Sequence, residues 1–268
     1  MAKFEEDMSR QTLKEKLDAG KFMLGTWSQS ASPEVLEIIG YAGFDYTIID
    51  TEHGYFGLET AENLVRTAEA ADISPLVRVA LNEQHLILKA LDIGAQGVVV
   101  PQVTNAQEAA KAVAAARYYP DGTRGACPCI RAGKHYVPDW ATHATKANKD
   151  VVIVLLVEGQ DGVANIESIV DTPGVNGIMV GPFDLSVSLG VGGQLDHPLV
   201  TDFMRNAIAL CKQRNVHMFV PNFDLDLGRA RAAIEGWTAL GATNFTVGTD
   251  KLFFAHHMQN INRNIRGA

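Results

Sequence analysis

The chain has 268 residues, of which 47% are hydrophobic and 20% charged, and its formal net charge at pH 7 is -8. These values fit one globular domain with a large core, and the acidic charge argues against nucleic-acid binding as the main activity. No apolar run approaches the roughly 20 residues that span a bilayer, and Met1 to Gln11 lack the apolar core of a signal peptide. The three cysteines, an odd and low number, favour a reducing cytoplasm.

Short β-branched runs alternate with segments of helical period along the chain. Strands are predicted near 23–27, 45–50, 75–79, 97–101, 151–157, 176–180, 216–220 and 243–247. Helices are predicted near 33–42, 59–71, 83–92, 105–117, 161–170, 198–214 and 225–239, with a final helix near 250–265. Ser32-Pro33 is typical of a helix start, and Gly43, Gly94 and Gly241 stand where helices should end.

Eight alternations predict an α/β fold, a (β/α)8 TIM barrel formed as a single domain over residues 1–268. An N-terminal extension and helix are expected over about 1–20, and a packed or exchanged C-terminal helix over about 250–268. The strand 151–157 is apolar throughout, as in parallel strands buried on both faces. An open doubly wound sheet is the alternative, but its first strand is not followed by G-x-G-x-x-G.

The segment from Tyr119 to Asp150 is too long for a simple connection, and a short helix is predicted near 138–148. Long loops on the active face of a barrel are often lids or subunit contacts, although a plain structural excursion is equally compatible with the sequence. Within the segment, Cys127-Pro128-Cys129 is not the C-x-x-C pair of a zinc site, and an ordinary loop is the better interpretation.

Carboxylates follow two consecutive predicted strands. Glu158 follows the fifth strand and Asp184 the sixth, so both can reach one divalent cation, which prefers oxygen ligands. Alternatively, each pairs with a basic residue or caps a helix, and Asp184 could stabilise the first turn of a helix beginning near Pro182. Gly181 to Ser186 would also place free backbone N–H groups at that helix start, where they could bind a carboxylate or phosphate.

Three further polar residues follow the second strand, and an arginine ends the third. Asp50 could orient the ring of His53 and so form an acid/base dyad, while Glu52 could hold waters around a metal ion. Arg78 could stabilise an enolate or bind a carboxylate. An Asx-type turn and a structural salt bridge are the simpler alternatives. No predicted strand contains or ends in a lysine, so a Schiff-base aldolase is disfavoured.

Several motifs occur in an order that resembles the HpcH/HpaI family of metal-dependent class II pyruvate aldolases, which are 4-hydroxy-2-oxoacid aldolases. They are Gly25-Thr26-Trp27, Asp50-Thr51-Glu52-His53-Gly54, Val77-Arg78, Val100-Pro101-Gln102-Val103, Arg124-Gly125, Val157-Glu158 and Gly181-Pro182-Phe183-Asp184-Leu185-Ser186. The resemblance covers nearly the whole chain from about Gly20. The D-x-E-H and G-P-x-D-L-S elements carry most of its specificity.

The resemblance implies that Glu158 and Asp184 ligate Mg2+, Mn2+ or Co2+, and that pyruvate chelates this ion. Its carboxylate would also meet the backbone N–H groups of Phe183 and Asp184. Arg78 would stabilise the enolate, and His53, oriented by Asp50, would transfer protons. Trp27 and Gln102 match positions near the pocket.

The implied reaction is reversible cleavage of a 4-hydroxy-2-oxoacid into pyruvate and an aldehyde through a pyruvate enolate, within aromatic or sugar-acid catabolism. One departure is Leu156, because many relatives carry glutamine there. The resemblance also implies a hexamer, a trimer of dimers, in which subunits exchange the C-terminal helix.

Three alternatives remain at this stage. One is a CoA-ester lyase of the citrate-lyase-β or malyl-CoA type, although the sequence offers no basic cluster for the CoA phosphates. Another is a barrel that only binds a ligand, and a third is a phosphosugar isomerase, which the acidic turns after the last two strands disfavour.

Overall fold

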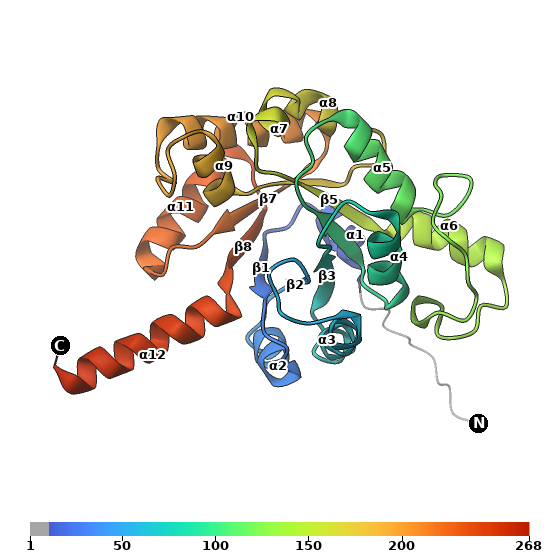
Figure 1. The fold of residues 1–268 in the computed structure, drawn as a ribbon, viewed down its shortest axis with the longest axis horizontal. Coiled ribbons are helices and arrows are strands. Elements are labelled where there is room, and N and C mark those ends of the chain that lie inside the picture. The colour runs from blue at the N-terminus through green and yellow to red at the C-terminus, as the bar shows by residue number, and fades with distance from the viewer. Residues whose placement is uncertain (1–10, 268) are drawn as a thin grey trace.

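The structure, a computed structural model, describes residues 11–267. Its eight parallel strands close into a barrel in sequence order, with the helices outside (Figure 1). This confirms the predicted barrel, and the doubly wound alternative is wrong. The strands are β1 (Met23–Ser28), β2 (Tyr46–Asp50), β3 (Ser74–Arg78), β4 (Gly97–Val100), β5 (Val152–Val157), β6 (Gly177–Val180), β7 (His217–Asn222) and β8 (Asn244–Thr249). Residues 1–10, part of the expected N-terminal extension, and residue 268 lie outside the described residues.

The helices follow the predicted order closely. They are α1 (Leu13–Asp18), α2 (Pro33–Tyr41), α3 (Leu58–Ala70), α4 (Gln84–Asp92), α5 (Ala106–Ala116), the 3-10 helix η1 (Arg131–Gly133), α6 (Trp140–Asp150), α7 (Gln160–Ala164), α8 (Ile166–Val170), α9 (Pro182–Ser188), α10 (Pro198–Arg214), α11 (Leu227–Leu240) and α12 (Asp250–Arg266). The predicted single helix 161–170 is wrong, because Asn165 separates α7 from α8. The side-chain amide of Asn165 donates to the carbonyl of Thr104 at 2.9 Å.

Two cores hold the barrel together. One fills the layer between strands and helices, and the other fills the barrel interior with alternate residues of the strands. Leu13 and Leu17 of α1 belong to the interior core, so α1 covers the end of the barrel at which the strands begin. The inward series Tyr46 and Ile48 continues by the strand period of two to Asp50 at the other end. That end is therefore free to carry a site.

The interior packing depends on glycines placed opposite large rings. A Cβ on Gly25 would lie 2.2 Å from Cε2 of Tyr46, much closer than atoms can approach. The Tyr46 ring is buried, lies edge-on to Phe219 at 5.6 Å between centroids, and its hydroxyl bonds the Thr246 hydroxyl at 2.8 Å. The large Tyr46 ring thus fits inside the barrel because β1 has no side chain at Gly25.

The long segment 117–139 joins α5 to α6 and packs beside α4. Arg124 pairs with Asp92 at 2.8 Å and stacks over Tyr118, and Arg131 donates to the carbonyl of Ile93 at 2.8 Å. Asp92 and Ile93 end α4 at the side where the strands begin. Thr123, in the same segment, accepts a hydrogen bond at 2.8 Å from the side-chain amide of Gln84, the first residue of α4, so the segment runs along the whole of this helix. Cys127 and Cys129 within it are exposed and free.

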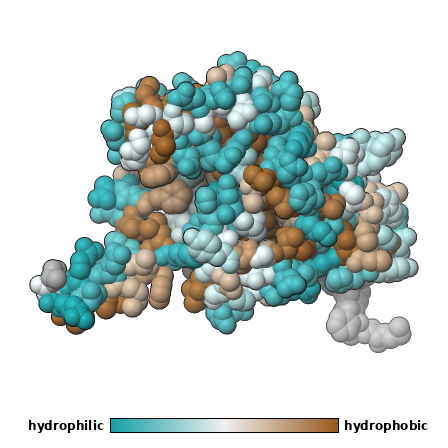
Figure 2. Space-filling view, in the orientation of Figure 1, coloured by the Kyte–Doolittle hydropathy of each residue, from teal (hydrophilic) through white to brown (hydrophobic). Residues whose placement is uncertain are grey.

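The C-terminal helix α12 projects from the barrel (Figure 1). Its first residue, Asp250, is buried, whereas Phe254, Met258, Ile261 and Ile265 are exposed large hydrophobic residues. Figure 2 shows hydrophobic surface along this helix and on the barrel beside its base. Among residues 11–267 no helix is long and apolar enough to cross a membrane.

Candidate active site

A cavity of about 140 Å³ opens at the carboxyl ends of the strands. It brings together six of the residues predicted from the sequence, which come from five different strand ends or the loops after them: Trp27, His53, Arg78, Glu158, Phe183 and Asp184. Asp50 and Glu52 lie directly behind Arg78, as described below, whereas Gln102 does not line this cavity. These predicted residues therefore lie together at the end of the barrel where the strands end.

Asp50 and Arg78 form the centre of the site. Nε of Arg78 donates to Oδ1 of Asp50 at 2.8 Å, and Nη2 donates to Oδ2 at 2.6 Å. Asp50 is fully buried and Arg78 is 7% exposed. Burial alone would raise the pKa of Asp50, but the hydrogen bonds and charge of Arg78 outweigh it and hold this pKa below its ordinary value. Asp50 therefore stays ionised at neutral pH.

The Arg78 guanidinium has two further neighbours. Nη1 lies 3.0 Å from Oε2 of Glu52, and the guanidinium carbon lies 4.3 Å from the centre of the Trp27 ring. Burial raises the pKa of Glu52, with the charges of Asp50 and Asp184 acting in the same direction. Asp50 and Glu52 bind the edges of the guanidinium, and Trp27 packs on one of its faces, so its orientation at the cavity is fixed.

His53 follows Asp50 in a short turn. Its backbone N–H and that of Glu52 both donate to Oδ1 of Asp50 at 3.1 Å. Among the described residues, no hydrogen bond joins Asp50 to the His53 ring, which was the contact expected for a dyad. Asp50 therefore fixes the backbone of the turn, and His53 lines the cavity from that turn.

Glu158 continues the inward series of β5 beyond Leu156. Oε1 accepts the backbone N–H of Gln102 at 2.9 Å. Gln102 has a φ of +55°, a left-handed conformation that few non-glycine residues adopt. The backbone of Gln102, and not its side chain, is thus the part that contacts the site. Burial raises the pKa of Glu158 to about 7, and the nearby charges of Asp184 and Glu52 add to this effect.

Asp184 lies in the first turn of α9, and its side chain is exposed. The helix begins after Gly181, which has no side chain to cap it, with Pro182 in the first turn. A Cβ on Gly181 would lie 2.9 Å from Oε2 of Glu158. A side chain at this position would therefore displace the neighbouring carboxylate of Glu158. Phe183, next in the turn, is exposed and lines the cavity.

The donor set fits a divalent cation. Burial is the main cause of the raised pKa of Glu158, and the negative charges of Asp184 and Glu52 add to it; a cation would relieve this repulsion. Within residues 11–267 no group of three or more His, Cys, Asp or Glu side chains is arranged to hold an ion. A metal would thus rest on two carboxylates with substrate and water completing its shell, an arrangement common for Mg2+.

Other residues of the cavity were not predicted. Gln29 follows β1, Pro221 lies near the end of β7, Phe223 follows β7, and Thr249 ends β8. The signal for Gln29 and Thr249 was present, because each is a polar residue at a strand end. Leu156 and Met179 form an apolar floor, so the position at which glutamine was expected contributes no hydrogen bond.

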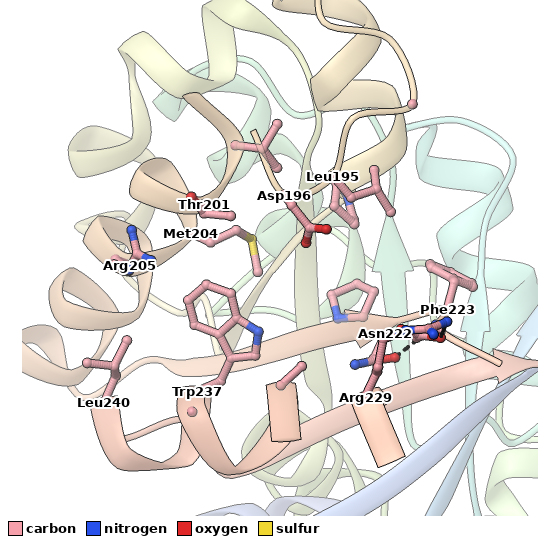
Figure 3. Close-up of a pocket in the computed structure, with 17 residues that line it drawn as sticks. Leu195, Asp196, Thr201, Met204, Arg205, Asn222, Phe223, Arg229, Trp237 and Leu240 are labelled. Atoms are coloured by element: carbon pink, nitrogen blue, oxygen red, sulfur yellow. Dashed lines mark hydrogen bonds and ion pairs between the residues drawn. The ribbon is translucent and has the colours of Figure 1, made fainter. Parts of the chain in front are cut away.

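A larger cavity of about 670 Å³ adjoins the site between α10 and α11 and shares Pro182, Pro221 and Phe223 with it. Met204 and Trp237 face each other across this cavity (Figure 3). Arg229 at its rim is held by Asp224, with nitrogen to oxygen distances of 2.7 Å. Phe223 thus lines both the small cavity and the roomier space beside it.

Comparisons with known proteins agree with this geometry. The sequence profile of the family described as HpcH/HpaI aldolase/citrate lyase matches residues 23–255, and the chain belongs to this family. It is 38% identical over 189 residues to 2-dehydro-3,6-dideoxy-6-sulfogluconate aldolase of Pseudomonas putida, covering 70% of this chain and 73% of the relative. It is 35% identical over 238 residues to 5-keto-4-deoxy-D-glucarate aldolase of Salmonella paratyphi C (strain RKS4594), covering 88% and 90% of the two chains.

The solved structure of an HpcH/HpaI aldolase from Desulfitobacterium hafniense DCB-2 superimposes with a TM-score of 0.88 at 29% identity, covering 96% of this chain and 97% of that one. The similarity to aldolases over most of the chain makes this protein a carbon-carbon lyase, an aldolase of the class II type. It disfavours both the CoA-ester lyase and the non-catalytic barrel. The family generally depends on divalent metals.

Proposed function

We propose that this protein reversibly cleaves a 4-hydroxy-2-oxoacid of the sugar-acid class into pyruvate and an aldehyde. The observation that carries the proposal is the fixed Arg78 guanidinium beside the carboxylates Glu158 and Asp184 in one small cavity. Cleavage takes the proton from the C4 hydroxyl, breaks the C3–C4 bond, and leaves the electron pair on an enolate of pyruvate. That enolate needs positive charge beside its oxygen.

Glu158 and Asp184 would hold the divalent cation, which we propose to be Mg2+, Mn2+ or Co2+. When bound, such an ion polarises the 2-oxo group and offsets the negative charge of the enolate. Glu52 would hold waters around it. The small volume of the cavity suits a ligand of the size of pyruvate, and the pyruvate carboxylate would meet the backbone N–H groups of Phe183 and Asp184 at the uncapped start of α9.

Arg78 would donate to the enolate oxygen. A guanidinium has five N–H groups, and the contacts with Asp50 and Glu52 engage one on each of its three nitrogens. The second N–H on each Nη is available to a ligand. Because the orientation is already fixed, little reorganisation is needed when the charge develops.

His53 would carry the proton between the C4 hydroxyl of the substrate and solvent. It reaches the cavity from a turn that Asp50 fixes through its backbone. Trp27 would support Arg78 from one face, and Gln102 would act by holding Glu158. Within this proposal, Asp50 and Gln102 position other residues and do not contact the substrate.

The sugar-acid class rests on the relatives, both of which are named for oxoacids derived from sugar acids. Hydrogen exchange tests the proposal without knowledge of the aldehyde. The protein is incubated with pyruvate in D2O, with and without Mg2+, Mn2+ or Co2+, and loss of the methyl-proton signal is followed by NMR. Metal-dependent exchange supports enolate formation, and aldehydes of sugar-acid type are then screened. Absence of exchange with every metal contradicts the proposal.

For the assembly we propose a homo-oligomer, a hexamer formed as a trimer of dimers, in which α12 contacts a second copy of the chain. The exposed apolar residues of α12 support this, because an exposed apolar face on a projecting helix is unfavourable in water. Analytical ultracentrifugation of Phe254→Glu and Ile261→Glu should show smaller species than the native chain. The free cysteines support a location in the cytoplasm.

A further inference from the structure

The loop that follows β1 is attached to the first residue of α12. Oδ1 of Asp250 accepts the backbone N–H of Gln29 at 3.0 Å, and Oδ2 accepts the backbone N–H of Ser30 at 2.9 Å and its hydroxyl at 2.5 Å. Asp250 is 8% exposed. A buried carboxylate that accepts this many hydrogen bonds fixes both groups strongly, so the loop and the base of α12 form one rigid unit.

The side chain of Gln29 extends from this unit to the centre of the site. Its Nε2 donates to Oδ2 of Asp50 at 2.9 Å. The orientation of the amide is determined by chemistry, because an ionised carboxylate only accepts hydrogen bonds and must therefore face the NH2 group. Oδ2 of Asp50 is the same atom that accepts Nη2 of Arg78. Three contacts thus connect the first residue of α12 with the arginine of the site.

We infer that Gln29 and Asp250 are positioning residues for Arg78, acting through the carboxylate of Asp50. This inference rests on the proposed function, in which Arg78 donates to the enolate oxygen. Oδ1 of Asp50 is held by two backbone N–H groups of the turn, whereas among the described residues Gln29 is the additional donor that holds Oδ2. Without Gln29, Oδ2 keeps among the described residues the contact with Nη2 of Arg78 alone, so the shared plane of the carboxylate and the guanidinium is held less firmly.

Through this connection, the base of α12 helps to hold a residue of the site in place. Asp250 begins this helix, and the rest of α12 leaves the barrel and presents the apolar residues described above. Contacts that hold α12 therefore also hold the loop that carries Gln29.

Two variants test the inference at its two ends. Asp250→Asn keeps the shape but places an NH2 group opposite one of the two backbone donors, and Gln29→Met keeps the length but removes the donor. Each should slow metal-dependent exchange of the pyruvate methyl protons about tenfold, the size typical of contacts that orient a site residue. The affinities for the metal ion and for pyruvate should change less than twofold.

A double mutant separates positioning from a general structural effect. In the Arg78→Lys background, adding Gln29→Met should produce no further loss, because the group that Gln29 positions is already absent. A second loss of the same size as in the native chain would overturn the inference. Asp226→Asn is the matched control, because Asp226 caps α11 by accepting the backbone N–H of Arg229 at 2.9 Å and does not touch the site.

A readout without catalysis distinguishes this inference from the proposed function. In the ¹⁵N-labelled protein, the Nε–H signal of Arg78 is assigned by its disappearance in Arg78→Lys, and its exchange with solvent is measured. Asp250→Asn and Gln29→Met should accelerate this exchange about tenfold, whereas Asp226→Asn should not. If the native protein fails to exchange pyruvate but the Arg78 signal responds, the proposed function falls and the positioning network stands. An unchanged Arg78 signal in both variants overturns the network.

Discussion

Asp50 and Arg78 are paired residues in the register of β2 and β3, and two hydrogen bonds of 2.8 and 2.6 Å join their side chains. Each is the last residue of its strand. The alternation of parallel strands sends both side chains into the barrel at the same height. The ion pair that fixes the orientation of the arginine is thus a direct consequence of strand register.

Replacing Arg78 with lysine should reduce metal-dependent pyruvate exchange about a hundredfold, the size found when a preformed donor to an oxyanion is lost. An ammonium group cannot pair with both oxygens of Asp50 and donate to a ligand in the same plane. The rate is measured by NMR in D2O. Arg124→Lys is the matched control, since Arg124 is an equally buried arginine paired with Asp92 at the other end of the barrel. Near-native exchange in Arg78→Lys would contradict the enolate role.

Asp184→Ala should abolish metal-dependent exchange and leave the fold intact. The residue lies on the exposed first turn of α9, where substitutions usually change the free energy of unfolding by less than about 0.5 kcal/mol. Metal binding is measured by calorimetry and folding by circular dichroism. Asp161→Ala, at an exposed acidic position in the first turn of α7, should behave as the native chain. Full metal affinity in Asp184→Ala would exclude this residue as a ligand.

Metal affinity should increase between pH 6 and pH 8. Burial raises the pKa of Glu158 to about 7 in the metal-free protein, so below that pH a proton must leave before the carboxylate can bind a cation. Well below pH 7 the affinity should fall as much as about tenfold per pH unit, and above it the dependence should flatten. Calorimetry in two buffers of different ionisation enthalpy should detect release of a proton at pH 6. A pH-independent affinity without proton release would refute this assignment.

His53→Ala should slow pyruvate exchange and aldol cleavage by about 10²-fold, within the range of general acid and base catalysis. Pyruvate affinity should change little, because His53 is proposed to transfer a proton and not to bind the metal ion. Rates and dissociation constants are measured separately. His85→Ala, at an exposed histidine of α4, serves as the control. A variant that weakened pyruvate binding alone would place His53 in a different role.

Gly25→Ala should destabilise the barrel by about 1–3 kcal/mol, the usual cost of inserting a methyl group into a packed core. The added Cβ would meet the Tyr46 ring at 2.2 Å, so the ring must shift. Gly236→Ala in α11 meets no atom within 4 Å and should instead stabilise its helix by up to about 1 kcal/mol. Thermal unfolding at one protein concentration compares the two, and equal midpoints would argue against the tight fit of Tyr46.

The sequence by itself determined the order of the elements and the positions of the charged residues along them. Periodicity of two and of 3.6 residues is a local property, so the eight strands and most helices could be predicted with small shifts of their ends. Residues at strand ends of a parallel barrel meet at one face, and Arg78, Glu158 and Asp184 could be placed there for that reason alone.

Only the tertiary structure decided which partners these residues have. Asp50 bonds Arg78 rather than the ring of His53, Gln102 acts through its backbone, and Gln29 reaches Asp50 from a loop held by Asp250. Likewise, the segment 117–139 packs along α4. These contacts join residues that are distant in sequence, and they depend on strand register, side-chain direction and backbone conformation. None of these is encoded by the local pattern of hydrophobic and polar residues, because each arises only when the barrel closes.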